Sequence, residues 1–234
     1  MNKKCIAIIP ARGGSKRIPR KNIRDFLGEP IISYPIKAAL GSMLFEEVMV
    51  STDDEEIARV AKTFGAVVPF MRSKETSNDF STTAEVMIEV LKDYKQKGCE
   101  FDMACCIYPT ASLMTSARLK KAYELLVNSD ASSLIPITKF SSSIWRSFKI
   151  EDNKIGFIWP ENALKRTQDL PAAYHDCGQF YFFRVNEFLN TKSILHDTTI
   201  ALELPETEVQ DIDNEDDWRL AEFKYEFFMS DKRR

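Results

Sequence analysis

The sequence has few of the residues that build disulfide, zinc or membrane-spanning structures. Its 234 residues include five cysteines and two histidines, and no two cysteines have the C-x-x-C spacing of zinc and redox sites. No apolar stretch approaches the roughly 20 residues that a membrane helix needs. The first apolar run, Cys5–Pro10, is short and is followed at once by basic residues, which is not the pattern of a signal peptide. We therefore expect a reduced, cytoplasmic protein with no membrane partner.

The chain also lacks a strong excess of charge of either sign. Its 32 Lys and Arg residues stand against 35 Asp and Glu residues, which gives a net charge of −3. Proteins that bind nucleic acid usually carry a basic footprint over the whole domain, so we expect no nucleic-acid partner. A chain of this length fits one domain that buries a full core. We expect that domain to span residues 1–234.

Short apolar runs alternate with amphipathic segments over the first 140 residues. The runs have the length of buried strands, and the segments between them have the i, i+3, i+4, i+7 spacing of helices. This alternation predicts an α/β fold with a Rossmann-like, mostly parallel sheet flanked by helices. The expected strands are Cys5–Pro10, Val48–Ser51, Ala66–Pro69 (a weaker candidate), Met103–Tyr108, Ser132–Ile137, Gln179–Arg184 and Thr199–Leu204.

Capping residues mark the ends of the expected helices. Asp53 with Glu56 three residues later predicts an N-cap, and Gly65 stands where that helix should end. The pattern breaks near residue 140, where aromatic residues flank a polar turn and predict a hairpin-like excursion from the sheet. The other signals are a helix ending at Gly98, a helix following Ser116, a last helix from Asn214 with Trp218, Ala221, Tyr225 and Phe228 on one face, and a frayed tail at Lys232–Arg234.

Two glycines and six basic residues follow the first expected strand, with no acidic residue among them. In an open α/β sheet, ligands bind beyond the carboxyl ends of the strands. Adjacent glycines let backbone amides approach oxyanions, and nearby cations offset the repulsion within a triphosphate. The loop has neither the Walker A nor the dinucleotide glycine spacing. We interpret it as a phosphate-binding loop rather than a solvated basic loop. It contains Gly13, Gly14 and the bases Arg12, Lys16, Arg17, Arg20, Lys21 and Arg24.

An acidic stretch near the C-terminus complements this loop. From Glu203 to Asp217 there are eight acidic residues and no basic one. Two carboxylates at a strand end can converge on Mg²⁺, which accepts few protein carboxylates and fills its other positions with water and phosphate oxygens. We predict that Asp211 and Asp213 bind this metal. The remaining acids form a solvated turn in this interpretation, with Asn214 capping the last helix.

A polar stretch precedes the expected strand Gln179–Arg184. It suits a polyhydroxylated acid, because Arg166 can clamp a carboxylate through two hydrogen bonds. The residues alone leave open whether His175 is a general base or a structural hydrogen-bonding group.

Four segments resemble the CMP-sialic acid synthetases, the acylneuraminate cytidylyltransferase family. The resemblance spans nearly the whole chain, and its first motif is long enough to be specific. Within the family, the chain is most similar to the pseudaminic acid cytidylyltransferases, because Tyr108 and Cys177 stand where sialic acid enzymes commonly have Gln and Asn. The segments that carry the resemblance are Ile9–Asn22, Ser51–Ile57, Tyr108–Thr110 and Gln210–Asp213, with Arg166–Pro171 and Tyr174–Tyr181 for the subfamily.

The resemblance implies a nucleotidyltransferase domain that uses CTP and Mg²⁺ to couple CMP to a nine-carbon acidic sugar. It also implies a homodimer that exchanges residues 140–164. Neuraminate, legionaminate and Kdo remain alternative sugars, and a nucleotide-binding protein without turnover remains an alternative function. The implied catalytic residues are Arg12, Lys16, Lys21 and Asp211, with Asp211 and Asp213 on the metal. The implied nucleotide ligands are Ala11, Gly13, Gly14, Ser15, Asn22 (ribose) and Arg72 (cytosine), and the implied sugar ligands are Tyr108, Arg166, Gln168, Asp169, His175 and Gln179.

Overall fold

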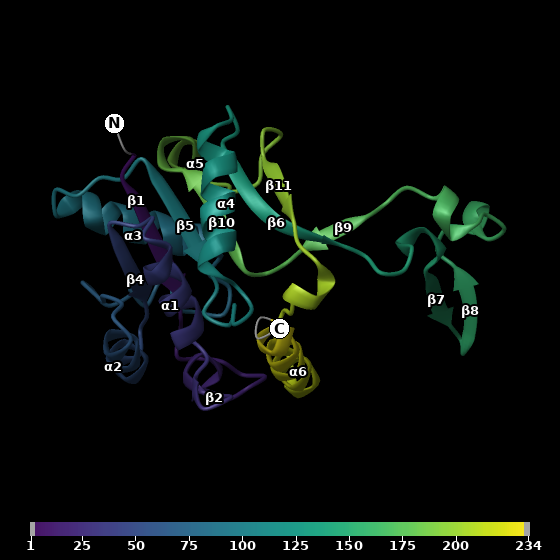
Figure 1. The fold of residues 1–234 in the computed structure, drawn as a ribbon, viewed down its shortest axis with the longest axis horizontal. Helices are drawn as coiled ribbons and strands as arrows, with labels where there is room; N and C mark the ends of the chain where they lie inside the picture. The colour runs from purple at the N-terminus through teal and green to yellow at the C-terminus, as the bar shows by residue number, and fades with distance from the viewer. Residues whose placement is uncertain (1–2, 232–234) are drawn as a thin grey trace.

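The computed structural model describes residues 3–231 and has a seven-stranded sheet at its centre, with helices on both faces (Figure 1). The expected tail at Lys232–Arg234 lies outside the described residues. The strands of this sheet are β1 (Cys5–Pro10), β4 (Glu47–Ser51), β5 (Met103–Ile107), β6 (Ser133–Lys139), β9 (Tyr174–Asp176), β10 (Phe180–Arg184) and β11 (Ile200–Glu203). Two small two-stranded sheets pair β2 (Asp25–Phe26) with β3 (Glu29–Pro30) and β7 (Phe148–Glu151) with β8 (Lys154–Phe157).

Five of the six strands along the main order β11-β6-β10-β5-β1-β4 point the same way. Strand β10 alone runs antiparallel to both of its neighbours, β5 and β6. The predicted α/β class and mostly parallel sheet are therefore confirmed, with two reversed strands, β10 and β9, that the apolar pattern did not reveal. The weaker candidate Ala66–Pro69 forms only an isolated bridge between Val67 and Met49. The reversal has a consequence for the site, because residues just before β10 lie at the carboxyl edge of β5.

Helices cover both faces of the sheet, which explains why its strands are continuous apolar runs. Along β1, Cys5, Ala7 and Ile9 face one helical layer, and Ile6 and Ile8 face the other. No helix within residues 3–231 has the length and apolar character needed to cross a membrane. The first layer contains α1 (Ser33–Ser42), α2 (Glu55–Thr63) and α4 (Ser116–Val127), and the second contains α3 (Thr83–Gln96) and α5 (Val185–Thr191).

The last helix, α6 (Glu215–Asp231), packs over the small sheet that follows the basic loop. Asn214 is its N-cap, because its side-chain oxygen accepts hydrogen bonds from the amides of Asp216 and Asp217 at 2.9 and 3.0 Å. Trp218 is buried against Phe26, with their ring centroids 5.6 Å apart. The C-terminal helix thus closes against the N-terminal third of the chain.

The start of α2 differs from the prediction by one residue. Asp54 is the N-cap, since its carboxylate accepts from the amides of Glu56 and Ile57 at 2.9 and 3.0 Å. The expected cap, Asp53, instead accepts a 2.9 Å hydrogen bond from the amide of Gly13. A two-acid run satisfies the capping pattern at either position, and the contact to the glycine loop decides between them. Short 3-10 helices complete the chain at η1 (Lys21–Ile23), η2 (Ile144–Arg146), η3 (Pro160–Asn162), η4 (Thr167–Asp169) and η5 (Glu206–Glu208).

Residues 140–173, here called the arm, project away from the sheet beyond β6 and β9 (Figure 1). Its hairpin β7–β8 turns at Asp152 and Asn153, which both have positive φ (50° and 59°), as a tight two-residue hairpin turn requires. The arm closes where the amide of Phe140 donates to the carbonyl of Ala173 at 3.0 Å. The expected hairpin is confirmed, but the excursion is longer than residues 140–164 and includes the segment around Arg166.

Candidate active site

A cavity of about 600 Å³ lies where β1 and β5 end. Three stretches that are far apart in the sequence form its walls: the basic loop after β1, the segment after β5, and the acidic segment before α6. The sheet order explains this meeting, because parallel strands present their carboxyl ends along one edge. The residues that line the cavity are Pro10, Arg12, Ser15, Lys16, Arg17, Lys21, Asn22, Tyr108, Pro109, Thr110, Asp211 and Asp213.

The basic loop is anchored to the start of α2. A Cβ atom on Gly13 would lie 2.7 Å from Oδ2 of Asp54, so this position requires glycine. Arg20, which has a left-handed backbone conformation (φ 55°), forms ion pairs with Asp54 and Glu56. The hydrogen bond from Arg20 is the main reason that the pKa of Asp54 falls to about 2. Arg20 therefore fixes the loop and does not line the cavity.

The other predicted nucleotide ligands have different surroundings. Ala11 is fully buried, and its amide donates to the carbonyl of Ser51 at 2.9 Å. Asn22 lines the cavity, and its amide nitrogen holds the carbonyl of Arg12 at 2.9 Å. Ser15 also lines the cavity. A Cβ atom on Gly14 would meet nothing within 4 Å, so the folded chain has no steric need for glycine there.

Cations of the loop reach both sides of the cavity. The ammonium of Lys21 donates to the carbonyl of Ile212 at 2.7 Å, and burial lowers its pKa. Arg17 forms a 2.7 Å ion pair with Asp213. Arg12 and Lys16 are both paired with one carboxylate from another loop, that of Asp79, which is described below. The four cavity-facing cations thus converge on the place where the sequence predicts a triphosphate.

The two aspartates predicted to bind metal share this cavity. Burial, followed by the charge of Asp213, raises the pKa of Asp211. A cation between the two carboxylates would relieve both effects. Residues 3–231 contain no group of three or more His, Cys, Asp or Glu side chains suited to a metal. Two carboxylates are a donor set that suits an ion such as Mg²⁺, which takes few protein carboxylates and completes its shell with water and phosphate oxygens.

Arg72, the residue predicted to meet cytosine, is buried beside the end of β4. Its Nε donates to Oγ of Ser51 at 3.0 Å, and its Nη2 donates to the Ser51 carbonyl at 2.5 Å. Burial lowers its pKa, and the positive charge of Arg12 acts in the same direction. Arg72 supports the end of β4, where the Ser51 carbonyl also accepts from the amide of Ala11, and it does not line the 600 Å³ cavity.

A smaller cavity of about 250 Å³ adjoins the first one across Tyr108, which lines both. The hydroxyl of Tyr181 donates to the carboxylate of Asp176 at 2.7 Å, and the hydroxyl of Tyr108 lies 3.3 Å from that of Thr83. Asp176, Tyr181 and Thr83 were not predicted as site residues. The reversed direction of β10 places Asp176 at this edge, and strand direction was not visible in the sequence pattern. The other lining residues are Ala84, Lys192, Ser193, Ile194 and Leu195.

Two predicted sugar ligands lie outside both cavities. Gln179 is buried, and its side-chain amide donates to the backbone carbonyl of Glu208 at 2.6 Å. The backbone carbonyl of Gln179 accepts from the backbone amide of Tyr108 at 2.8 Å. These contacts position Tyr108. His175 is exposed on β9, where its ring packs against Phe140 with centroids 4.7 Å apart. The alternation of side chains along β9 turns Asp176, and not His175, toward the smaller cavity.

Three further predicted sugar ligands, Arg166, Gln168 and Asp169, belong to the arm. Arg166 forms two hydrogen bonds to Asp169, at 2.7 and 3.0 Å. Gln168 lines a separate cavity of about 570 Å³ at the base of the arm, together with Phe140 and Pro171. Because the arm projects from the sheet, a single chain does not bring these residues to its own phosphate loop (Figure 1).

The meeting of a basic glycine loop and two aspartates at one strand edge can be compared with known proteins. A family model for cytidylyltransferases matches residues 6–214. The chain belongs to the cytidylyltransferase family. It is accordingly an enzyme of the nucleotidyltransferase class.

Two relatives and one solved structure that are similar to this cytidylyltransferase are named as enzymes that couple CMP to acidic sugars. The chain is 42% identical over 223 residues to the pseudaminic acid cytidylyltransferase of Campylobacter jejuni, covering 95% of this chain and 96% of that protein. It is 34% identical over 226 residues to the CMP-N,N'-diacetyllegionaminic acid synthase of Legionella pneumophila, covering 93% and 94%. Its fold resembles that of a CMP:2-keto-3-deoxy-manno-octonic acid synthetase complexed with CTP, with a TM-score of 0.69, 16% identity and coverage of 97% and 99%. That last likeness shows a shared fold.

Proposed function

We propose that this cytidylyltransferase transfers CMP from CTP to the anomeric hydroxyl of pseudaminic acid and releases pyrophosphate. The observation that carries the proposal is the 600 Å³ cavity in which Arg12 and Lys16 face Asp211 and Asp213. Such a site matches the charge of a triphosphate and a divalent cation. The choice of sugar is supported by the identity of 42–43% to two pseudaminic acid cytidylyltransferases, against 34% to the legionaminic acid synthase.

The reaction is an in-line displacement at the α-phosphorus of CTP. The anomeric oxygen forms a bond to phosphorus and loses its proton, while the bond between the α-phosphorus and the bridging oxygen breaks and pyrophosphate leaves. Such a transfer depends mainly on positioning and on charge stabilisation. Arg12 and Lys16 stabilise the charge that builds on the leaving pyrophosphate. Lys21 holds the phosphate chain from the other side while its hydrogen bond to Ile212 fixes the aspartate segment.

We propose Mg²⁺ as the metal, held by Asp211 and Asp213. When bound, it would neutralise phosphate charge and make the α-phosphorus a better electrophile. The contribution of the chain is to hold two carboxylates at one wall of the cavity. Gly178 leaves room for the side chain of Asp211, since a Cβ atom there would lie 3.3 Å from Cγ of Asp211 and the residue has φ of 61°.

The sugar is proposed to bind across Tyr108, in the smaller cavity that adjoins the nucleotide. That cavity combines an apolar wall, formed by Ala84, Ile194 and Leu195, with the polar pair Asp176 and Tyr181. This mixture suits a ring that carries acylamino and hydroxyl groups. The anomeric carbon would then face the α-phosphorus, because Tyr108 is common to both cavities.

A homodimer is proposed to complete the site. The hairpin of the arm leaves large apolar side chains exposed: Phe148 is 53%, Ile150 is 74% and Ile155 is 70% exposed. A two-stranded hairpin is at best marginally stable alone. Exposed apolar side chains on such a hairpin indicate a surface that packs against another protein surface. A second copy that receives the arm would cover them, and would bring Arg166 and Gln168 to the sugar site of the partner. We propose the cytoplasm as the location, because CTP is a cytoplasmic nucleotide.

The deciding experiment is pyrophosphate release by the purified protein with CTP and pseudaminic acid. Neuraminate, legionaminate and Kdo serve as parallel substrates, and each reaction is repeated with EDTA. We expect release with pseudaminic acid, formation of its CMP conjugate by mass, and loss of both with EDTA. Faster turnover of another sugar would reassign the substrate. CTP binding without release for every sugar would favour a nucleotide-binding protein instead.

A further inference from the structure

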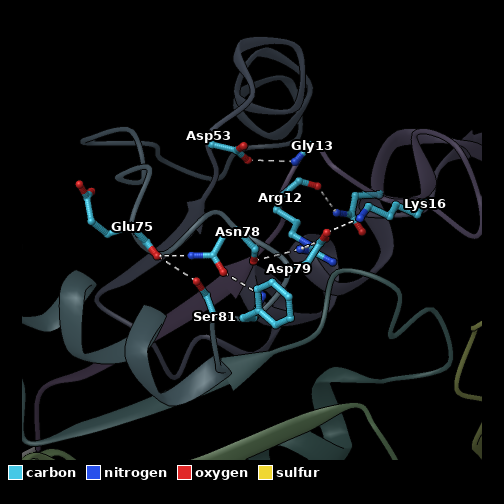
Figure 2. Close-up of polar contacts among 10 residues, drawn as sticks. Arg12, Gly13, Lys16, Asp53, Glu75, Asn78, Asp79 and Ser81 are labelled. Carbon is cyan, nitrogen blue, oxygen red and sulfur yellow. Dashed lines mark hydrogen bonds and ion pairs between the residues drawn. The ribbon is translucent and has the colours of Figure 1, made fainter.

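Arg12 and Lys16, the two cations proposed to meet the leaving phosphates, are both paired with Asp79 (Figure 2). Arg12 donates to one carboxylate oxygen of Asp79 at 2.8 Å and to the carbonyl of Asn78 at 3.1 Å, and Lys16 pairs with the other oxygen. The pKa of Asp79 is lowered, first by the hydrogen bond from Lys16. One carboxylate therefore occupies the positions at which two phosphate oxygens would contact these cations.

Asp79 comes from a segment whose first half is attached to α3, where Ser73 and Thr76 both donate to the carboxylate of Glu89. Residue 72 is fixed to β4, since its amide donates to the carbonyl of Thr52 at 2.8 Å, and Thr82 caps α3. Between them, the side chains of Asn78 and Ser81 both donate to the carbonyl of Glu75, at 2.6 and 3.0 Å (Figure 2). Within the described chain, Arg12 and Lys16 are the only hydrogen-bond partners of residues 78–81 that lie outside segment 73–82. Residues 78–81 thus contact the phosphate loop through the Asp79 carboxylate and the Asn78 carbonyl.

Half-exposed ion pairs of this kind are weak. The side chains of Arg12, Asp79 and Lys16 are 36%, 38% and 77% exposed. A polyphosphate carries several negative charges and offers oxygens to both cations at once, so it can displace a single carboxylate. A nucleoside monophosphate has one phosphate, which the proposed reaction places at the α position, away from the two cations.

We propose that Asp79 is a competing anion that weakens the binding of polyphosphates, whose oxygens reach both Arg12 and Lys16, and leaves the binding of CMP unaffected. The identity of the nucleotide rests on the proposed function. Asp79 leaves the two cations when the β- and γ-phosphates arrive, and returns when pyrophosphate departs. It thereby lowers the affinity for the triphosphate and keeps the cations neutralised after turnover.

The test compares ligand binding to wild-type protein, Asp79→Asn and Glu75→Gln by calorimetry at fixed low salt, without sugar. The ligands are CTP, CMP and inorganic tripolyphosphate. Glu75→Gln is the matched control, because it removes the same charge from the same segment without a contact to Arg12 or Lys16. We expect Asp79→Asn to bind CTP and tripolyphosphate roughly threefold to tenfold more tightly, from the loss of two competing ion pairs. CMP affinity should stay unchanged, and Glu75→Gln should match wild type for all three ligands.

Three outcomes would overturn the proposal. Weaker or unchanged CTP binding by Asp79→Asn would mean that Asp79 orients the cations or has no influence on them. Equal tightening of CTP and CMP would indicate a general field effect instead of competition, as would tightening by Glu75→Gln. Wild-type protein that binds tripolyphosphate but not CTP would contradict the proposed function, and the tripolyphosphate comparison would still decide the role of Asp79. Unfolding temperatures of the variants verify that all three proteins are folded.

Discussion

The ammonium of Lys21 donates a 2.7 Å hydrogen bond to the carbonyl of Ile212, the residue between Asp211 and Asp213. This contact joins two segments that are 191 positions apart in the sequence. Lys21 is thus a structural tie as well as a proposed phosphate ligand. It holds the basic loop and the aspartate segment at the separation that the cavity requires.

Replacement of Lys21 by Met keeps the length of the side chain but removes the charge and the donor. We expect turnover to fall about 10²-fold, by analogy with the loss of other charge-stabilising donors. The free energy of unfolding should fall by about 1–3 kcal/mol, because the Ile212 carbonyl loses a charged partner in a half-buried position. Pyrophosphate release and chemical denaturation measure the two effects. The exposed Lys62→Met, on α2, is the control, and wild-type turnover by Lys21→Met would contradict the assignment.

The carboxylate pair can be tested by neutral substitutions of the same shape. We expect Asp211→Asn to lose about 10²–10³ of its turnover, because one of two proposed metal ligands is replaced by a weaker donor. Stability should not fall, since Asp211 is a charge held near another negative charge. Asp216→Asn is the matched control: its side chain is 93% exposed and is absent from the cavity. Metal titration of turnover should show a higher Mg²⁺ requirement for Asp211→Asn alone. Equal turnover of the two variants would reject the metal site.

Much of the fold could be predicted because local patterns determine it. The strand Cys5–Pro10 is apolar throughout since both of its faces are covered, and Asn214 caps α6 through contacts made within four residues. The direction of β10 depends on its partners β5 and β6, which are distant in the sequence, so the pattern could not give it. Asp54, and not the predicted Asp53, caps α2 for a similar reason, because Asp53 contacts Gly13, which is distant in the sequence.

The site was predictable where residue type determines chemistry and not where geometry does. The basic loop was predicted from its glycines, its cations and its place after the first strand, and the pair Asp211/Asp213 from its charge; both line one cavity. Asp79 was missed because nothing in its neighbourhood in the sequence marks it, and only the folded chain brings it to Arg12. Arg166 was predicted to clamp a carboxylate from its residue type and from the resemblance, and the structure puts it at the start of η4 on the arm.

The anchor between Arg20 and Asp54 predicts a specific pH dependence of stability. The pKa of Asp54 is lowered from 3.8 to about 2, mainly by its hydrogen bond with Arg20. A carboxyl whose folded-state pKa is depressed stabilises the fold above its unfolded pKa, and that stabilisation is lost as the pH falls toward the folded value. At neutral pH, the free energy of unfolding of wild type should therefore exceed that of Asp54→Asn by about 1–2 kcal/mol. The difference reports the charge, because an asparagine at this position still caps α2. The difference should shrink between pH 4 and 2.

Chemical denaturation at several pH values measures this difference. Arg20→Gln supplies the check, because it removes the cause of the low pKa while leaving Asp54 in place. When both proteins also carry Arg20→Gln, the difference in their free energy of unfolding should change less between pH 4 and 2. A difference between wild type and Asp54→Asn that is constant down to pH 2 would show that the ion pair does not stabilise the fold.

The proposed exchange of the arm predicts that two inactive proteins can restore activity to each other. Arg166→Ala should lose turnover because the proposed sugar clamp is absent, and Asp211→Asn should lose it because the proposed metal ligand is absent. If Arg166 serves the partner's site, a mixed dimer has one intact site, which combines Asp211 of the first variant with Arg166 of the second. An equal mixture that re-equilibrates should then recover about a quarter of wild-type activity, since half of the dimers are mixed and half of their sites are intact.

The same experiment separates exchange from action within one chain. If Arg166 folded back onto its own cavity, each site of a mixed dimer would lack one of the two residues, and mixing would restore nothing. A third protein, with Ile150 and Ile155 both replaced by Ser, removes exposed apolar area from the hairpin without touching either residue. Sedimentation should show a larger monomer fraction than for wild type, because Ile150 and Ile155 are two of the most exposed apolar side chains of the arm. Its turnover should fall with its dimer fraction and recover at high protein concentration, which a defect within the cavity would not do.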